Sequence, residues 1–246
     1  MATYIIADLH LSENKPLLLN ALANFYDKTL ILNDRLIILG DMFDVFVGVD
    51  PKSAFHQKIR SIISKAHARG ITTLFQRGNR DFLMDSKAAD YFCMTLISDF
   101  YAIPTINGNA LLMHGDQLCA QDRSYQNFKR FSNNPLVKAV FMCLPLSTRE
   151  NIGSKIRSKS ENRESRNDLE RHLRNPNVKK LGRMFLEKAK CKLLIHGHFH
   201  VYGGEDNAFG EGTYRLGLGM WDSNFSYIKV DRNELKLVQR KMEKNF

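Results

Sequence analysis

The chain has 246 residues, of which 43% are hydrophobic and 25% are charged, a composition typical of a soluble globular protein. Its apolar runs are too short to form a helix that spans a bilayer. We expect no cleavable secretory leader, because the first predicted strand begins at Thr3. The four cysteines form no C-x-x-C pair, which indicates reduced thiols in a cytosolic protein.

The formal net charge of +10 is concentrated in one segment. Residues 121–190 contain 17 Lys and Arg against 7 Asp and Glu, whereas the rest of the chain contains 19 of each. A localised positive surface predicts an anionic partner, either a phosphorylated substrate, an anionic lipid or nucleic acid. The alternative is a solvated helical face that is merely basic. We interpret 121–190 as a helical cap inserted into a core formed by 1–120 and 191–246.

The first two-thirds of the chain alternate apolar, β-branched runs with amphipathic stretches, which predicts alternating strands and helices. The expected elements are strand 3–8, helix 16–29, strand 36–39, helix 53–69, strand 71–75 and helix 86–92. Pro16 suits a first helical turn, Ser53 suits an N-cap, and Gly70 suits a helix end.

The remaining chain divides into helical and β-rich parts. Asn107-Gly108 predicts a hairpin that pairs 101–106 with 109–113. Residues 121–190 lose the strand pattern and are predicted to be helical, with a polar loop over part of 147–167. The later expected strands are 191–196, 213–218, 225–231 and 234–241. We therefore predict a layered α/β core with mixed sheets, capped by a helical insertion.

Polar motifs follow five of the apolar runs. They are Asp8-x-His10, Gly40-Asp41, Gly78-Asn79-Arg80-Asp81, His114-Gly115-Asp116 and His198-x-His200. Each motif alone is a weak signal, but polar residues at the carboxyl ends of several buried strands predict one shared crevice. Two Asp, one Asn and four His meeting there predict a dinuclear metal site.

The ligands divide naturally between two cations. The expected set is Asp41 as the bridge, Asp8, His10 and His200 on the first metal, and Asn79, His114 and His198 on the second. Asp8 and His10 are two residues apart, so in an extended chain they would point the same way. A donor set without Cys favours Mn²⁺, with Fe or Zn as alternatives. Two such metal ions lower the pKa of a bound water molecule and bind both the attacking and the leaving oxygen of a displacement at phosphorus.

This set of motifs resembles the calcineurin-type metallophosphoesterases. Many members of that superfamily have His after the Asn, where it can protonate an alkoxide leaving group. Here Arg80 occupies that position, and Arg does not give up a proton at neutral pH. Arg80 instead suits a leaving group that needs no proton, such as a phosphate, which points to cleavage of a diphosphate.

Longer matches resemble one family, the UDP-2,3-diacylglucosamine diphosphatases of lipid A synthesis, over nearly the whole chain. In the core they are Ile6 to Ser12, Leu39 to Asp44, Arg77 to Leu83 and His114 to Cys119. In the insertion they are Asp122-x-x-Tyr125-Gln126, Asn134-Pro135, Leu144-Pro145-Leu146, Arg149 and Arg157 to Ser160. The insertion matches are specific, because the wider superfamily has no such segment.

The resemblance implies hydrolysis of a UDP-linked diacylated glucosamine to UMP and the lipid 1-phosphate (lipid X), with two Mn²⁺ ions. It also implies a peripheral location on the cytoplasmic face of the inner membrane of a Gram-negative bacterium. We expect a monomer that binds no nucleic acid. The catalytic residues it implies are Asp41, Asn79, Arg80 and His114. The substrate contacts it implies are Asn79, Arg80, Asp122, Ser160 and His198.

Two stretches depart from the family pattern. The family has G-H-T-H-R-P at the last motif, whereas this chain has Phe199, Val201 and Tyr202 at the three altered positions. Family Asn and Lys residues are replaced by Glu164 and Asn167, so those substrate contacts are not carried over.

Apolar and basic residues of the insertion fall at partly helical spacing, from Phe128 to Arg149. Such a surface could accept acyl chains and rest on an anionic membrane, or it could simply pack on the core. Two other functions stay open. One is a phosphoesterase acting on nucleotides or nucleic acid, and the other is a non-catalytic lipid-binding homologue.

Overall fold

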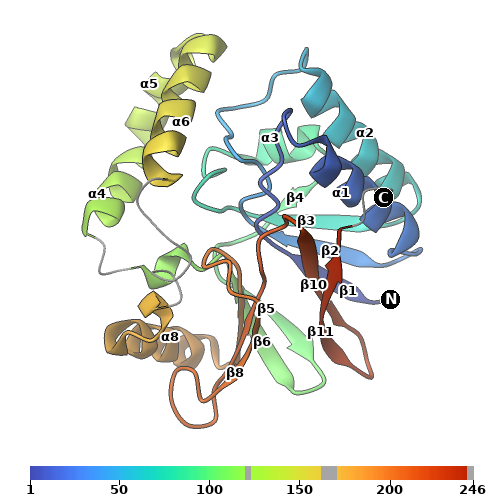
Figure 1. Ribbon diagram of the computed structural model, residues 1–246, viewed down its shortest axis with the longest axis vertical. Coiled ribbons are helices and arrows are strands. Elements are labelled where there is room, and N and C mark those ends of the chain that lie inside the picture. The colour runs from blue at the N-terminus through green and yellow to red at the C-terminus, as the bar shows by residue number, and fades with distance from the viewer. Residues whose placement is uncertain (120–122, 162–170, 243–246) are drawn as a thin grey trace.

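Two β-sheets packed face to face form the centre of the computed structural model, which describes residues 1–119, 123–161 and 171–242 (Figure 1). The strands are β1 (Thr3–Ile6), β2 (Arg35–Leu39), β3 (Thr72–Gln76), β4 (Thr95–Leu96), β5 (Tyr101–Thr105), β6 (Gly108–Met113), β7 (Leu193–His196), β8 (Gly203–Asp206), β9 (Tyr214–Gly217), β10 (Asn224–Val230) and β11 (Leu235–Lys241). The helices are α1 (Pro16–Lys28), α2 (Ala54–Ala68), α3 (Ser86–Tyr91), the short 3₁₀ helix η1 (Asp116–Leu118), α4 (Arg123–Ser132), α5 (Pro135–Cys143), α6 (Leu146–Glu161) and α8 (Pro176–Ala189).

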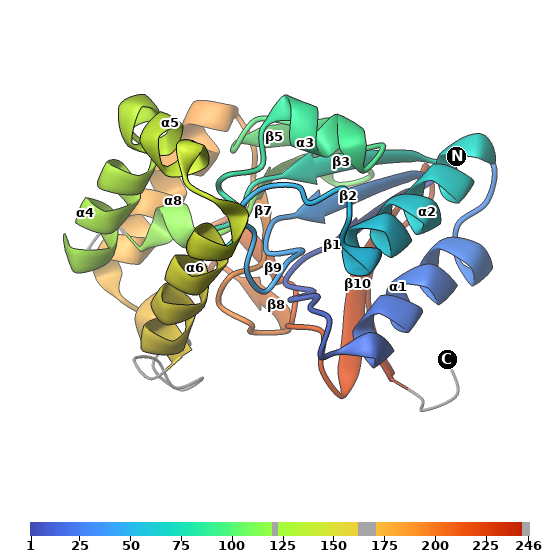
Figure 2. The same ribbon diagram turned by 90° about the horizontal axis from the view of Figure 1, so that it is seen from above.

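The layers follow from the alternation of side chains along the strands. The six-stranded sheet has the order β11-β10-β1-β2-β3-β4, and the five-stranded sheet has the order β5-β6-β7-β9-β8. Ile5 and Ile37 pack between the two sheets, whereas the adjacent Ile6 and Ile38 pack with α1 and α2 on the outer face. Figure 2 shows α1 and α2 side by side along that sheet. The predicted layered α/β fold with mixed sheets is confirmed.

Parallel pairing brings the carboxyl ends of the central strands to one edge. In the first sheet β1, β2 and β3 are parallel neighbours, with Ile5 opposite Ile37 and Ile37 opposite Leu74. In the second sheet β6 and β7 are parallel, with Leu112 opposite Ile195. All five predicted motifs therefore leave their strands in the same direction.

Local signals place the first helices where they were predicted. Pro16 occupies the first turn of α1. Ser53 caps α2 by accepting a hydrogen bond from the backbone N–H of His56 at 3.3 Å. The chain leaves α2 through Gly70, whose φ of +78° suits glycine.

Two expectations about local structure are wrong. β1 ends at Ile6 rather than at residue 8, because the backbone turns into the left-handed region at Asp8. The β5–β6 turn is formed by residues 106–107, one position earlier than predicted, since Thr105 pairs with Gly108. The polar stretch expected to be partly a loop is helical as far as Glu161, and the loop itself stays a prediction, because residues 162–167 lie outside the described part.

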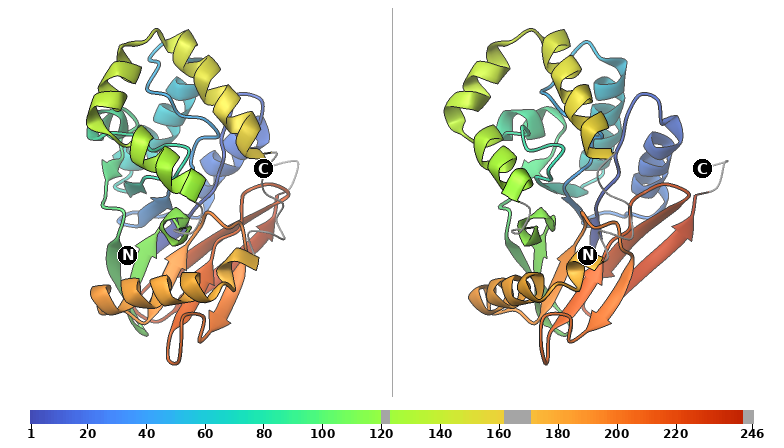
Figure 3. Two further views of the ribbon diagram at one scale, coloured as in Figure 1. Left: turned by 90° about the vertical axis from the view of Figure 1, so that its left-hand side faces the viewer. Right: turned by 60° about the vertical axis from the view of Figure 1, so that its left-hand side comes forward.

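Helices α4, α5 and α6 stand beside the sheets, whereas α8 runs along the outer face of the five-stranded sheet (Figures 1 and 3). Val178 and Leu186 of α8 pack there against Leu111 and Leu194. No residue of α5 is buried. Within the ranges described, none of the helices combines the length and apolar character needed to cross a membrane.

Candidate dinuclear metal centre

Seven predicted ligands come together where the two sheets present their carboxyl ends. Asp8 and His10 follow β1, Asp41 follows β2, and Asn79 follows β3. His114 follows β6, and His198 and His200 follow β7. Five of these residues have a positive φ, namely Asp8 (55°), His10 (46°), Asp41 (52°), His198 (64°) and His200 (55°). Such backbone costs of order 1–3 kcal/mol per residue and is characteristic of functional sites, where it holds side chains in one direction.

Glycines allow the ligand loops to approach closely. A Cβ atom on Gly78 would lie 2.2 Å from the Asp41 Oδ1 atom, and one on Gly197 would lie 2.3 Å from the Asp8 Oδ2 atom. Neither space accepts a side chain, because the neighbouring atoms belong to buried carboxylates. The glycines of the third and fifth motifs are therefore required by the packing of the predicted ligands.

Asp8, His10 and His200 form the first group, and their donor atoms lie within 4.8 Å of one another. The His10 and His200 Nε2 atoms are 3.2 Å apart, and the His200 Nε2 atom is 3.7 Å from Asp8 Oδ1. Two atoms that each lie roughly 2.1 Å from one ion at right angles are about 3 Å apart. The Asp8 Oδ1 atom is buried and has no hydrogen-bond partner, as expected of an oxygen that serves a cation.

Asn79, His114 and His198 form the second group around one amide oxygen. The Asn79 Oδ1 atom is 2.9 Å from His114 Nε2 and 2.8 Å from His198 Nδ1. The other ring nitrogen of His114, Nδ1, lies 2.7 Å from the Leu39 carbonyl oxygen. A proton on Nδ1 donates to that carbonyl and leaves Nε2 free to coordinate, which is the usual arrangement of a ligating His.

Asp41 lies between the groups. Its Oδ1 atom is 3.5 Å from His114 Nε2, and Asp41, Asp8 and His114 form a second cluster of potential ligands. The Arg80 backbone N–H donates to Asp41 Oδ1 at 2.9 Å, and the Arg80 Nε atom is 3.3 Å from Asp41 Oδ2. The Asp41 carboxylate can therefore bridge two cations, and the Arg80 guanidinium lies beside it.

The electrostatics of the site favour added positive charge. Burial alone would lower the pKa of His114, but the Asp41 and Asp8 carboxylates raise it to about 9. Burial also raises the pKa of Asp41. It lowers the pKa of His198 to about 3, and it is the main cause of the lowered pKa of His10. Ligands coordinate as neutral imidazole and ionised carboxylate, so a cation here would replace the proton on His114. The donor set and its charge therefore fit divalent metal ions.

Asp81 is a structural member of the site that the sequence interpretation left without a role. Its Oδ2 atom accepts the Met42 N–H at 2.8 Å, and its Oδ1 atom accepts the Gly78 N–H at 2.7 Å. It thereby fastens the turn that carries Asp41 to the turn that carries Asn79. The one signal for this role in the sequence was the position of Asp81 at the end of the third motif.

Contacts from the helices of the insertion reach the edge of the site. The Lys129 Nζ atom of α4 pairs with Asp116, which is buried just beyond His114. The Arg157 Nε atom of α6 is 3.0 Å from Asp44 Oδ1, which is 3.9 Å from the His10 ring. Basic side chains of the insertion are therefore directed toward the predicted metal centre.

The predicted substrate contacts are only partly described. Asp122, Glu164 and Asn167 lie outside the described residues, and Ser160 is the penultimate residue of α6. Phe199, where the family pattern has Thr, is fully buried, and its ring lies 5.1 Å from that of His198. The altered position therefore packs against the predicted ligand His198 from the core side.

Comparisons with known proteins identify the family of this chain. The calcineurin-like phosphoesterase family model matches residues 1–202. The chain is 34% identical to the UDP-2,3-diacylglucosamine hydrolase of Tolumonas auensis over 98% of this chain and 97% of that protein. It is 35% identical to the protein of the same name from Pectobacterium carotovorum, over 97% and 98% of the two chains. Vacuolar protein sorting 29 of Cryptosporidium parvum superimposes with a TM-score of 0.45 at 11% identity, covering 100% of this chain and 93% of that one. This chain belongs to the calcineurin-like phosphoesterases and, within them, to the family of the UDP-2,3-diacylglucosamine hydrolases.

Proposed function

We propose that this hydrolase cleaves the diphosphate of UDP-2,3-diacylglucosamine and releases UMP and 2,3-diacylglucosamine 1-phosphate, a step of lipid A biosynthesis. The names of its relatives support this substrate. The observation that carries the reaction type is the position of Arg80, whose Nε atom is 3.3 Å from Asp41 Oδ2. A guanidinium donates no proton at neutral pH, so this site suits a phosphate leaving group, which needs none. Arg80 would stabilise the negative charge of the phosphoryl group under attack.

We assign the seven converging side chains as ligands of two Mn²⁺ ions. Asp41 would bridge them, with Asp8, His10 and His200 holding one ion and Asn79, His114 and His198 holding the other. The oxygen and imidazole donors support Mn²⁺. His198 would coordinate through Nδ1, because its Nε2 atom lies 3.4 Å from the Cys119 Sγ atom. When bound, such a pair supplies activated water and binds the oxygens of an in-line displacement.

Substrate recognition is assigned to residues around these ligands. Asn79, Arg80 and His198 border the metal centre in the described part of the chain, and we add Asp122 and Ser160 on the family pattern. A substrate diphosphate would lie against Arg80, and His114 would be held by its hydrogen bond to Leu39.

The insertion would serve the lipid half of the substrate. We propose the division into a core, 1–120 with 191–246, and a basic insertion, 121–190, in which α8 packs on the five-stranded sheet. Phe131, Leu136 and Val140 are 64%, 76% and 68% exposed. Apolar side chains of this kind among lysines and arginines support binding of acyl chains and attachment of a monomer to the anionic cytoplasmic surface of the inner membrane.

The test compares three substrates with one preparation of Mn²⁺-loaded protein in detergent. UDP-2,3-diacylglucosamine, a nucleotide phosphodiester and single-stranded nucleic acid are each supplied, and the products are identified by mass spectrometry. We expect UMP and the lipid 1-phosphate from the first, at a much higher kcat/KM than any release from the others. Faster cleavage of nucleic acid would favour the nucleotide alternative. Lipid binding without turnover by metal-loaded protein would favour the non-catalytic alternative.

A further inference from the structure

The His10 ring turns one nitrogen toward the other predicted ligands and the second nitrogen away from them. Its Nε2 atom is 3.2 Å from His200 Nε2, within the first ligand group. Its Nδ1 atom is buried and has no hydrogen-bond partner among the described residues. A His that coordinates through Nε2 carries its proton on Nδ1, and it normally donates that proton to a carboxylate, a carbonyl or water. His10 therefore needs a partner at Nδ1 when it holds a cation.

The Asp44 carboxylate lies on that side of the His10 ring. Its Oδ1 atom is 3.9 Å from His10 Nδ1, about 1 Å beyond the usual hydrogen-bond length. The backbone holds the two residues in this relation, because the Leu11 N–H donates to the Met42 carbonyl oxygen at 2.9 Å and the Asp44 N–H donates to the Leu11 carbonyl oxygen at 3.0 Å. The His10 side chain is 2% exposed and the Asp44 side chain is 20% exposed, so the carboxylate is the partner that can rotate to close the gap.

The same oxygen of Asp44 is held from the insertion. The Arg157 Nε atom of α6 donates to Asp44 Oδ1 at 3.0 Å. Other contacts also keep α6 on the core, since Gly153 packs against the Val47 side chain and Arg149 donates to the Val47 carbonyl oxygen. Arg157 therefore controls the direction of the Asp44 carboxylate more than the position of α6.

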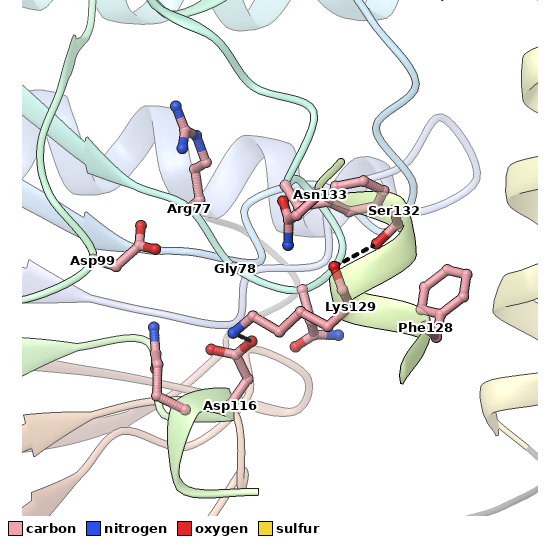
Figure 4. A pocket seen from close by; sticks show the side chains of 11 residues that line it. Arg77, Gly78, Asp99, Asp116, Phe128, Lys129, Ser132 and Asn133 are labelled. Atoms are coloured by element: carbon pink, nitrogen blue, oxygen red, sulfur yellow. Dashed lines mark hydrogen bonds and ion pairs between the residues drawn. The ribbon is translucent and has the colours of Figure 1, made fainter. Parts of the chain in front are cut away.

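A second ion pair between the insertion and the core provides a comparison. Figure 4 shows the Lys129 side chain extending from α4 to Asp116, just beyond the predicted ligand His114. There the outward nitrogen of the ligand already has a partner, because His114 Nδ1 lies 2.7 Å from the Leu39 carbonyl oxygen. The Lys129 pair has the same charges as the Arg157 pair, but it is not needed to orient a ligand.

We propose that Asp44 is a positioning residue that accepts the Nδ1–H of His10, and that Arg157 of the insertion holds the Asp44 carboxylate in this role. The proposal rests on the assignment of His10 as a metal ligand in the proposed function. Without Arg157 the carboxylate can turn toward Lys15, whose Nζ atom is 4.0 Å from Asp44 Oδ1. Docking of α6 and metal binding by the first ligand group are thereby coupled, and each strengthens the other.

The sign of the effect separates positioning from simple electrostatics. If only charge mattered, removing a positive side chain near the site would strengthen the binding of a divalent cation. Arg157→Ala and Lys129→Ala each remove one positive charge at the edge of the centre. The positioning role predicts that Arg157→Ala weakens Mn²⁺ binding, whereas Lys129→Ala does not.

The test titrates metal-free protein with Mn²⁺ by calorimetry, without substrate. Asp44→Ala should weaken one of the two binding steps by roughly 10- to 100-fold, the usual effect of removing the outer partner of a ligating His. Arg157→Ala should weaken the same step by a smaller factor, and Arg157→Lys should recover part of that loss. The double variant should bind no more weakly than Asp44→Ala, because Arg157 acts through Asp44.

Arg149→Ala is the matched control on the same helix. It removes a basic contact between α6 and the core without touching the Asp44 carboxylate, so its Mn²⁺ affinity should equal that of wild type. Hydrogen exchange gives an independent reading of the coupling. Adding Mn²⁺ should slow the exchange of α6 amides in wild type and have little effect on them in Asp44→Ala.

The outcomes also separate this role from the proposed function. Wild-type Mn²⁺ affinity in Asp44→Ala and Arg157→Ala, or tighter binding by Arg157→Ala, would overturn the positioning role. An equal loss in Arg149→Ala would overturn it as well, because docking of α6 would then be the cause. No substrate is used, so a wild type that releases no UMP would overturn the proposed function and leave these results standing. A wild type that binds no Mn²⁺ would overturn both the metal assignment and the positioning role.

Discussion

Asp81 gives the sharpest test of how the ligand turns are held together. Its carboxylate is fully buried and accepts two backbone N–H groups, from Met42 at 2.8 Å and from Gly78 at 2.7 Å. Asp81→Ala leaves both donors buried without an acceptor, and each such donor costs about 1–3 kcal/mol. We therefore expect the free energy of unfolding to fall by about 2–6 kcal/mol. Asp81→Asn keeps one carbonyl acceptor, so about 1–3 kcal/mol should be lost.

Urea unfolding followed by circular dichroism, in chelator and with Mn²⁺, measures these changes. The Asp81→Ala variant can fail to fold, because a loss of about 6 kcal/mol can exceed the whole free energy of unfolding of a domain. The milder Asp81→Asn variant is included so that a folded protein can still be measured. Both variants should also bind Mn²⁺ more weakly, since Asp41 and Asn79 lie in the two turns that Asp81 joins. Asp90→Ala, at an exposed position of α3, is the control. Unfolding of both Asp81 variants within about 0.5 kcal/mol of wild type would refute the reasoning.

Three further predictions concern separate parts of the molecule. Asp41→Ala should abolish UMP release but keep the native circular dichroism spectrum, because burial already raises the pKa of the Asp41 carboxyl and disfavours its charged form. Near-normal activity of this variant would contradict the bridging role. Burial lowers the pKa of His56, whose Nδ1 atom accepts a hydrogen bond from the Asp50 N–H. The free energy of unfolding should therefore fall as the pH drops below about 6.5, where the unfolded chain takes up a proton more readily than the folded one. His56→Gln should flatten this pH dependence in thermal melts. Gly182→Ala should destabilise by about 1–3 kcal/mol in urea, because its Cβ would lie 2.3 Å from the buried Phe209 ring, whereas helix propensity alone predicts a gain.

The convergence of the seven predicted ligands could be predicted from sequence, but their local geometry could not. Buried strands and the polar residues that follow them are encoded locally, so the five motifs could be placed at one edge. The extended geometry expected for Asp8 and His10 is wrong, because distant parts of the chain shape that turn. The Asp8 carbonyl accepts the Trp221 N–H at 3.0 Å, and its Oδ2 atom accepts the His198 N–H at 2.8 Å.

The extent of the helix within the polar stretch could not be predicted from sequence for a similar reason. α6 has little amphipathic pattern of its own, and contacts with the core stabilise it. Gly153 packs against the Val45 and Val47 side chains, and Arg149 donates to the Val47 carbonyl oxygen. The edge strand β8 was also missed, since its sequence begins with two glycines and lacks apolar alternation.

A metal titration of turnover tests the central claim most directly. Protein stripped of metal would receive Mn²⁺ in steps, with bound metal counted and UMP release from UDP-2,3-diacylglucosamine measured on the same samples. The account predicts no release in chelator and activity that rises until two ions are bound per chain. Release of UMP by metal-free protein, or no release with both ions bound to folded protein, would contradict it.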